Sequence, residues 1–180
     1  MKHKKICVYC AASPRIDSIY FDATAQFAEL LVAEQSEVIF GGGATGLMGH
    51  LADTVIKSKG KITGIMPHFM KVRERQHKDV INFHFVEDMR TRKRLLMEQA
   101  DAIVALPGGT GTLDELMEVI TLKKLGLCEK PIAILNTNNY YAPLKALFDK
   151  IDTEGFMDNQ EHWHFVDHPE ELIQYLHKNL

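Results

Sequence analysis

The chain has 180 residues, 46% of them apolar and 25% charged, and its formal net charge is −3. This length and composition predict one soluble globular domain, residues 1–180, with a single core. The negative charge argues against a general surface for nucleic acid or an anionic membrane. No apolar run is long enough to cross a bilayer, and the start, MKHKKICVYCAAS, lacks a signal-peptide layout, so we expect a cytoplasmic protein.

Short β-branched runs alternate with longer stretches of helical periodicity along the chain. The pattern predicts strands at residues 5–9, 37–40, 62–66, 102–106 and 131–135, and an alternating run, VINFHFVED, after the charged stretch 71–79. It predicts helices at about residues 20–34, 46–58, 89–99, 112–125, 140–151 and 169–180.

This alternation predicts an α/β fold with a doubly wound, mostly parallel sheet and helices on both faces. The almost wholly apolar run 102–106 indicates a strand buried on both faces of the sheet. In such folds, ligands bind at the carboxyl ends of strands, near the point where the strand order reverses. The loops 11–15, 41–45 and 107–111 are therefore the expected places for a site.

Three cysteines, Cys7, Cys10 and Cys128, are too few for a disulfide framework and fit a reducing compartment. The spacing of Cys7 and Cys10 is typical of redox and zinc motifs, but it falls in a predicted strand, where residues i and i+3 point to opposite faces. No second cysteine pair completes a zinc site. The nine histidines show no ligand spacing, and HWH at 162–164 is interpreted as a strand or loop edge, so the sequence predicts no metal.

The glycine-rich segment FGGGATGLMG, residues 40–49, follows a predicted strand and opens a predicted helix. It differs from the dinucleotide fingerprint, which follows the first strand and is followed about 20 residues later by an acid that binds the ribose. Its glycines, Gly42 and Gly43 among them, either bring the backbone close to a ligand or allow a tight turn under the helix. Its place at a strand end favours ligand contact.

A second glycine-rich segment, PGGTGT at 107–112, is the stronger signal. It lacks the Gly-Lys-Ser/Thr ending of a P-loop, so no lysine reaches a β- or γ-phosphate, which favours a monophosphate. Free N–H groups of residues 109–112 at a helix start, with the hydroxyls of Thr110 and Thr112, suit one phosphate dianion. The alternative is a bare turn from strand to helix.

Two acids, Asp114 and Glu115, follow at once and are expected in the first helical turn, where the helix dipole favours negative charge. Adjacent helix residues point about 100° apart, so at most one of them is expected to face a pocket. A carboxylate there is misplaced for holding phosphate. It is well placed for a sugar cation, such as the oxocarbenium-like state in hydrolysis of an N-glycosidic bond.

The basic segment MRTRKRLLMEQA, residues 89–100, supplies positive charge. Arg90 and Arg94 are interpreted as a solvated face of the helix. Arg92 and Lys93 are expected to face the phosphate site, because arginine holds phosphate in a bidentate manner.

Together, GGGATGLMG, MRTRK and PGGTGTLDE at these separations resemble segments of the Lonely-Guy proteins, cytokinin riboside 5′-monophosphate phosphoribohydrolases. ICVYCAAS, KPIAILNTNNYY and EGFM extend the resemblance to nearly the whole chain. The resemblance implies a Rossmann-like fold, a homodimer and no metal or redox cofactor. It implies hydrolysis of AMP or an N6-substituted AMP to free base and ribose 5-phosphate. Bacterial members also act as AMP nucleosidases, and some carry an old label as lysine decarboxylases.

By position, the resemblance implies that Arg92 and Glu115 are catalytic. Substrate binding is assigned to residues of the matching segments and of the loops at strand ends: Ser13, Gly42, Gly43, Glu74, Lys93, Gly108, Gly109, Thr110, Gly111, Thr112, Asp114 and Thr121. The chain departs from the family pattern at residues 11–13, Arg90, Asp114 and the run TLKKLGL. These departures leave the catalytic pair in place and bear on the base more than on the reaction.

Two other functions stay open from the sequence. One is a nucleotide-binding sensor or carrier of the same fold without catalysis. The other is a decarboxylase, which needs a pyridoxal-phosphate lysine in a recognisable context. Retention of Arg92 and Glu115 favours the hydrolase.

Overall fold

The structure is a computed structural model that describes residues 3–71, 75–157 and 162–180. Within these residues, seven strands form one sheet in the order β4-β3-β2-β1-β5-β6-β7. The strands are β1 (Lys5–Tyr9), β2 (Glu37–Phe40), β3 (Lys61–Pro67), β4 (Asn82–Val86), β5 (Ala102–Ala105), β6 (Ile132–Leu135) and β7 (His164–Val166). The helices are α1 (Ser18–Ala33), α2 (Gly46–Lys57), α3 (Met89–Glu98), α4 (Thr110–Lys124), α5 (Ala142–Thr153) and α6 (Pro169–Asn179), with short 3₁₀ turns at His68–Met70 and Thr137–Asn139.

All six neighbouring strand pairs run parallel, so the predicted doubly wound sheet is confirmed. The chain builds outward from β1 to β4 and then returns through α3 to place β5 on the other side of β1. The strand order therefore reverses between β1 and β5, which is where folds of this type form a ligand crevice.

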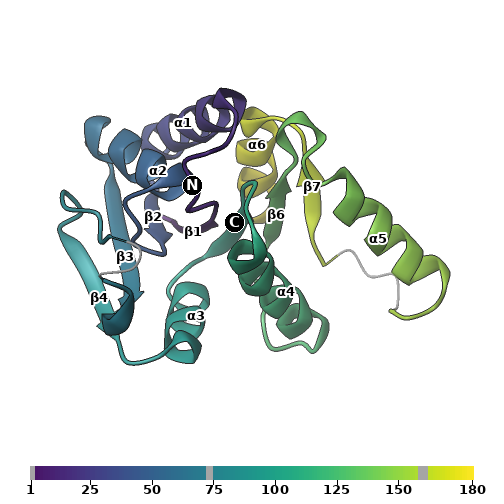
Figure 1. Ribbon diagram of the computed structural model, residues 1–180. Helices are drawn as coiled ribbons and strands as arrows, with labels where there is room; N and C mark the ends of the chain where they lie inside the picture. Colours follow the sequence, from purple (N-terminus) through teal and green to yellow (C-terminus); the bar gives the residue numbers. More distant parts are fainter. Residues whose placement is uncertain (1–2, 72–74, 158–161) are drawn as a thin grey trace.

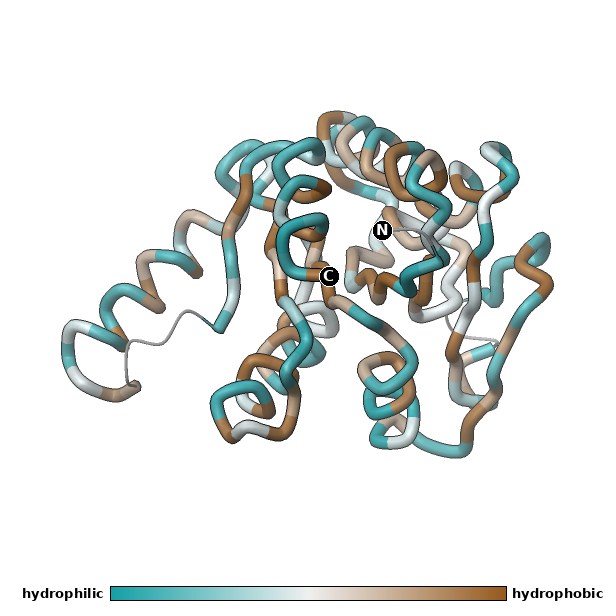
Figure 2. The backbone as a smooth tube through the Cα atoms, turned by 180° about the vertical axis from the view of Figure 1, so that it is seen from behind, coloured by the Kyte–Doolittle hydropathy of each residue, from teal (hydrophilic) through white to brown (hydrophobic). Residues whose placement is uncertain are grey.

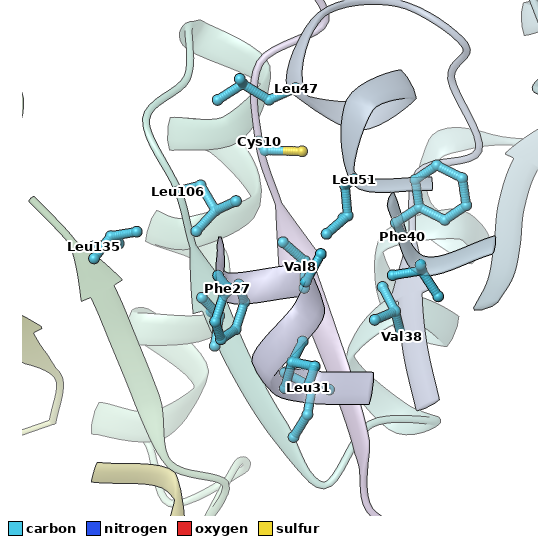
Figure 3. Close-up of a cluster of buried hydrophobic side chains, with 14 of the residues drawn as sticks. Val8, Cys10, Phe27, Leu31, Val38, Phe40, Leu47, Leu51, Leu106 and Leu135 are labelled. Carbon is cyan, nitrogen blue, oxygen red and sulfur yellow. The ribbon is translucent and has the colours of Figure 1, made fainter. Parts of the chain in front are cut away.

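Helices cover both faces of the sheet (Figure 1): α1, α2 and α6 lie on one side, and α3 and α4 on the other. Each side has its own apolar cluster. Figure 3 shows the first, in which Phe27 and Leu31 of α1 and Leu51 of α2 pack over Val8 of β1. Every residue of β5 is fully buried, as its apolar run predicts for a strand enclosed on both faces.

The starts of three helices differ from the predicted ones. The helix α1 begins at Ser18, two residues early, since Asp17 caps it by accepting a hydrogen bond from the Ile19 N–H at 3.0 Å. The helix α4 begins at Thr110, also two residues early. The helix α5 begins two residues late, at Ala142, because Tyr140 belongs to the turn before it.

Along their turns, the helices alternate between hydrophilic and hydrophobic residues (Figure 2), as expected for helices with one face on the core. No helix in the described part of the chain is both long and apolar enough to span a membrane. The run HWH gives its last residue, His164, to the edge strand β7.

The two cysteines of the C-x-x-C spacing lie on opposite faces of the sheet, as predicted. Cys7 belongs to the cluster under α3 and α4, whereas Cys10 packs beside Leu47 in the cluster of Figure 3. Both thiols are free and buried, and burial raises the pKa of each far above the usual value for a thiol. They can form neither a disulfide with each other nor a shared metal site in this arrangement.

We expect Cys7 and Cys10 to react slowly with a thiol reagent in the native protein, because the reactive species is the thiolate. Raising the pH through about 8.5, where ordinary thiols ionise, is expected to release neither of them. Concentrated guanidinium chloride should expose all three cysteines of the chain to the reagent. The measurement is a count of titrated thiols over time, and fast labelling of the native protein at Cys10 would contradict the burial.

Candidate functional site

A cavity of about 290 Å³ opens where the strand order reverses. Its walls come from the end of β1 and the loop after it, the residue after β2, α2, α3 and the start of α4. The lining residues are Val8, Tyr9, Cys10, Ala11, Ala12, Ser13, Gly41, Met48, Arg92, Gly109, Thr110, Gly111, Thr112 and Glu115. A larger hollow of about 640 Å³ lies between β7 and α6, away from the reversal. We place the site in the smaller cavity because glycine-rich backbone and paired charges converge there.

The first residues of α4 line this cavity. Its N-cap residue, Gly109, supplies no side-chain hydrogen bond. The first N–H groups of a helix have no partner within the helix, and they carry the positive end of the helix dipole. The N–H groups of residues 109–112 and the hydroxyls of Thr110 and Thr112 therefore form a cradle suited to an anion such as a phosphate.

The three glycines of this loop differ in what surrounds them. A Cβ on Gly108 would lie 2.1 Å from Thr112 Oγ1, so this glycine is required by packing, and it does not line the cavity. A Cβ on Gly109 or Gly111 would meet nothing within 4 Å. Both of these glycines line the cavity, with open space above them for a ligand.

The position predicted for the two acids is wrong. Because α4 begins at Thr110, Asp114 and Glu115 lie in its second turn, and the first turn contains no acid. The helix dipole acts mainly on the first turn, so it does not account for them. As predicted, only one acid faces the cavity: the Glu115 side chain is 12% exposed and lines it, whereas that of Asp114 is 58% exposed and points outward.

Arg92 is the cationic wall of the cavity. Its side chain is only 7% exposed, and two backbone carbonyls at strand ends anchor it. Nε donates to the Ile65 oxygen of β3 at 3.2 Å, and Nη2 donates to the Gly41 oxygen after β2 at 3.3 Å. A Cβ at position 41 would lie 2.2 Å from Nη2, so Arg92 can lie there only because residue 41 is glycine.

The remaining nitrogen of Arg92 faces Glu115. Nη1 lies 3.8 Å from Glu115 Oε1, which is an ion pair beyond the usual hydrogen-bond distance. Both side chains are largely buried, so solvent screens this pair far less than a surface pair. The two charges are fixed opposite each other with room for a ligand group to approach both.

Lys93 does not join this cavity, because it follows Arg92 on α3 and points along the flank of α4. Its Nζ lies 3.1 Å from Asp114 Oδ2 and 2.6 Å from Glu118 Oε2. The hydrogen bonds to Glu118 and then to Asp114 raise the pKa of Lys93, so its charge is held more firmly than usual. Lys93, Asp114 and Thr121 line a separate shallow depression of about 300 Å³.

The two arginines interpreted as a solvated face are exposed, which confirms that interpretation. Arg94 pairs with Glu98, one turn on, at 3.1 Å.

The glycine segment after β2 contributes only its first glycine, Gly41, to the cavity. Gly42, in the left-handed region with φ +83°, accepts a hydrogen bond from the His77 N–H at 3.0 Å, and Gly43 pairs with Gln76. These two predicted substrate-binding glycines thus join the backbone of the following segment and do not line the cavity. The predicted residue next to that segment, Glu74, lies outside the described residues.

The start of α2 is occupied by the protein itself. The Met48 N–H donates to the Ala11 oxygen at 3.2 Å, and the Thr45 hydroxyl donates to the Ala12 oxygen at 2.9 Å. This helix end therefore holds the loop after β1, whose Ser13 lines the cavity as predicted.

Sequence reasoning missed the apolar and backbone lining of the cavity. Tyr9 and Cys10 belong to a strand and its end, and Met48 lies in an amphipathic helix, so each reads as a core residue. Gly41 carried a signal, since it is the glycine directly after a strand, where backbone faces the crevice. The described residues contain no group of three or more His, Cys, Asp or Glu side chains that could hold a metal ion.

Known proteins resemble this chain in sequence over most of its length. A family model described as "possible lysine decarboxylase" matches residues 48–176. A probable cytokinin riboside 5′-monophosphate phosphoribohydrolase from Oryza sativa subsp. japonica is 40% identical over 85% of this chain and 69% of its own length. A cytokinin riboside 5′-monophosphate phosphoribohydrolase from Arabidopsis thaliana is 39% identical over 87% of this chain and 73% of its own length.

This chain belongs to the Lonely-Guy family. The match to the family model includes Arg92, Glu115 and the loop at 107–112, and it begins after Ser13 and Gly41. The fold is also found in a molybdenum cofactor binding protein from Rippkaea orientalis, with a TM-score of 0.76 and 19% identity over 99% of this chain and 98% of that one. At that identity the likeness concerns the Rossmann-like fold alone.

Because the space above Gly111 is open, a side chain added there should impair ligand binding without lowering the stability of the fold. We expect Gly111→Ala to keep or raise the free energy of unfolding, by up to about 1 kcal/mol, because alanine favours the helix. The added methyl group intrudes on the cradle, so the affinity for inorganic phosphate should fall at least about tenfold. Calorimetric titration and denaturant unfolding measure the two effects.

The matched control is Gly108→Ala, whose Cβ would collide with Thr112 Oγ1 and should lower stability. Phosphate binding by Gly111→Ala equal to that of the unaltered protein would rule out the cradle as an anion site.

Proposed function

We propose that this chain hydrolyses the N-glycosidic bond of a nucleoside 5′-monophosphate to free base and ribose 5-phosphate. The substrate is AMP or an N6-substituted AMP, such as a cytokinin riboside monophosphate. The named activity of the rice and Arabidopsis relatives supports the reaction. The observation that carries the proposal is the meeting of a glycine-rich helix N-terminus and a largely buried arginine–glutamate pair in one cavity.

Two parts of the substrate need two different surroundings. The phosphate is an anion, and the backbone N–H groups of residues 109–112 suit it. The ribosyl centre becomes cationic as the base leaves, and it needs a carboxylate. Glu115 is three residues after Thr112 on the same helix, about 5 Å farther along its axis, so one small sugar phosphate can reach both.

In the proposed reaction, water adds to the anomeric carbon as the bond to the base nitrogen breaks. Glu115 either stabilises the ribosyl cation or orients the attacking water. Because this carboxylate is largely buried and fixed in advance, its interaction with the developing charge is stronger than in water. Arg92, held by the carbonyls of Ile65 and Gly41, positions the substrate and assists departure of the base. A hydrolysis of this kind transfers no electrons, so the proposal includes no cofactor.

Substrate binding by Lys93, Asp114, Thr121 and Glu74 remains a proposal that rests on the family resemblance. The first three line the shallow depression, which Glu118 also lines, and not the main cavity. A decarboxylase, as the family model's description suggests, needs a neutral lysine to form a Schiff base. The carboxylates of Glu118 and Asp114 disfavour that role for Lys93, because they raise its pKa.

The main test is the replacement of the charged pair. We expect Arg92→Ala and Glu115→Gln each to lower kcat by at least about 10²–10³, the usual cost of losing one preorganised electrostatic partner. The assay is release of adenine and ribose 5-phosphate from AMP. Matched controls are Lys150→Ala and Glu154→Gln, which remove an exposed ion pair of α5 away from the cavity and should leave the rate unchanged.

The proposed mechanism fails if Glu115→Gln hydrolyses AMP at nearly the original rate. A panel of nucleoside monophosphates separates the hydrolase from a carrier of the same fold. Tight binding of AMP with release of base from none of the panel would establish the carrier.

We also propose that the protein is a cytoplasmic homodimer. The family resemblance implies the dimer, and free buried cysteines are compatible with a reducing compartment. An apolar surface at the end of α4 supports a second copy as the partner: Leu125 and Leu127 are 64% and 68% exposed, and Leu127 and Leu122 line a groove between α3 and α4.

For the dimer we expect a mass in solution twice that of the chain, measured by light scattering. The double variant Leu125→Glu/Leu127→Glu should be monomeric, because it places charge in the apolar contact. The control is Ile81→Glu, which alters an apolar residue outside this surface that is even more exposed, at 94%. A dimer that persists in the double variant would place the interface elsewhere.

A further inference from the structure

The loop between β5 and α4 comprises residues 106–109, and its first three carbonyls accept hydrogen bonds from other parts of the chain. The fourth, that of Gly109, accepts from the Leu113 N–H of α4 at 3.0 Å. The Tyr141 hydroxyl donates to the Leu106 oxygen at 2.8 Å. The Ala11 N–H donates to the Pro107 oxygen at 3.2 Å, and the Tyr140 hydroxyl donates to the Gly108 oxygen at 2.6 Å. The negative ends of these peptide dipoles are thereby fixed on protein donors.

Fixing a carbonyl also fixes the next N–H. The peptide bond is planar and trans, so its C=O and the following N–H point in opposite directions. The carbonyl of Gly108 shares its peptide with the N–H of Gly109, the first donor of the anion cradle. By holding the Gly108 oxygen, Tyr140 therefore sets the direction of the Gly109 N–H.

The neighbouring tyrosine has a different effect. Tyr141 holds the oxygen of Leu106, and the next residue is Pro107, whose nitrogen carries no hydrogen. Its buried hydroxyl also has a backbone hydrogen bond with Gly108. It therefore fixes the end of β5 and the start of the loop, whereas the donors of the cradle begin at Gly109.

The segment that carries both tyrosines is rigid. Asn138 and Asn139 adopt left-handed backbone with φ of +53° and +58°, a conformation that asparagine tolerates. Asn136 Oδ1 accepts a hydrogen bond from the Tyr141 N–H at 2.7 Å, and Asn136 Nδ2 donates to Asp167 at 2.9 Å. The ring of Tyr140 packs edge-on against those of Tyr141 and Tyr20, at 4.9 and 5.8 Å.

We propose that Tyr140 is a positioning residue for phosphate recognition, acting through the Gly108–Gly109 peptide. The inference rests on the proposed function, since it takes the cradle at 109–112 as the binding place of the 5′-phosphate. Tyr140 accordingly contributes to the preference for a phosphorylated nucleoside over its unphosphorylated parts, and it takes no part in bond cleavage.

The test compares Tyr140→Phe with Tyr141→Phe, which each remove one hydroxyl from adjacent rings. For Tyr140→Phe, we expect the Kd of ribose 5-phosphate and the KM of AMP to rise about three- to tenfold, the usual effect of one hydrogen bond. Its kcat and its Kd for adenine should stay within about twofold of the original values, as a loss confined to one hydrogen bond implies. Tyr141→Phe should lower the melting temperature and leave the Kd of ribose 5-phosphate unchanged.

Titration calorimetry with ribose 5-phosphate and with adenine gives the binding constants independently of catalysis. Unchanged binding of ribose 5-phosphate by Tyr140→Phe, or equal weakening for ribose 5-phosphate and adenine, overturns the role of Tyr140 and leaves the proposed hydrolase intact. If Tyr141→Phe weakens the binding of ribose 5-phosphate as much as Tyr140→Phe does, the role of Tyr140 is also overturned, because equal effects would indicate a general loosening of the loop. Binding of ribose 5-phosphate without hydrolysis of AMP by the unaltered protein overturns the hydrolase, while the comparison of variants still decides the role of Tyr140. If the unaltered protein does not bind ribose 5-phosphate, the role of Tyr140 in phosphate recognition falls, while release of adenine from AMP still decides the hydrolase.

Discussion

The site depends on the pairing of β1 with two neighbours, β2 on one side and β5 on the other. The chain leaves these strands in opposite directions around the sheet, so the loops at their ends separate and open a crevice. Ala11, two residues after the end of β1, connects the two walls. Its N–H donates to the oxygen of Pro107, before α4, and its oxygen accepts from the N–H of Met48 in α2. The backbone geometry of a parallel sheet thus fixes the distance across the cavity before any functional side chain is considered.

Within this frame, the two glycine-rich helix starts have different uses. The N-terminus of α2 is bonded to the loop after β1, so its donors stabilise the fold. At the start of α4, Gly109 provides no side-chain cap, and three carbonyls just before the helix are held on other donors. Carbonyls and N–H groups are thereby separated in space, which gives the cavity a positive backbone surface next to the carboxylate of Glu115.

Local pattern was sufficient to predict the sheet, the helices and the loops that surround the site. It was less informative about which of two adjacent residues faces the cavity. Arg92 and Lys93 are both basic and adjacent, and only the packing of α3 shows that Arg92 turns inward and Lys93 toward α4. Gly41 and Gly42 differ in the same way, because one residue of shift at a strand end reverses the side that faces the crevice. The start of α4 was misplaced because Thr110 and Gly111 are poor helix formers, yet both belong to the helix, whose N-cap residue is Gly109.

Arg92 links the charge of the site to the folding of the domain. It bonds to carbonyls 27 and 51 residues earlier in the sequence, so its place exists only when α3, β3 and the end of β2 have come together. Any local opening of α3 removes both bonds and withdraws the cation from Glu115 in the same event. Ligand binding therefore favours the closed state of α3, and protection of its amide hydrogens from exchange reports the integrity of the site. The charge of Arg92 and the long-range order of the domain therefore depend on the same contacts.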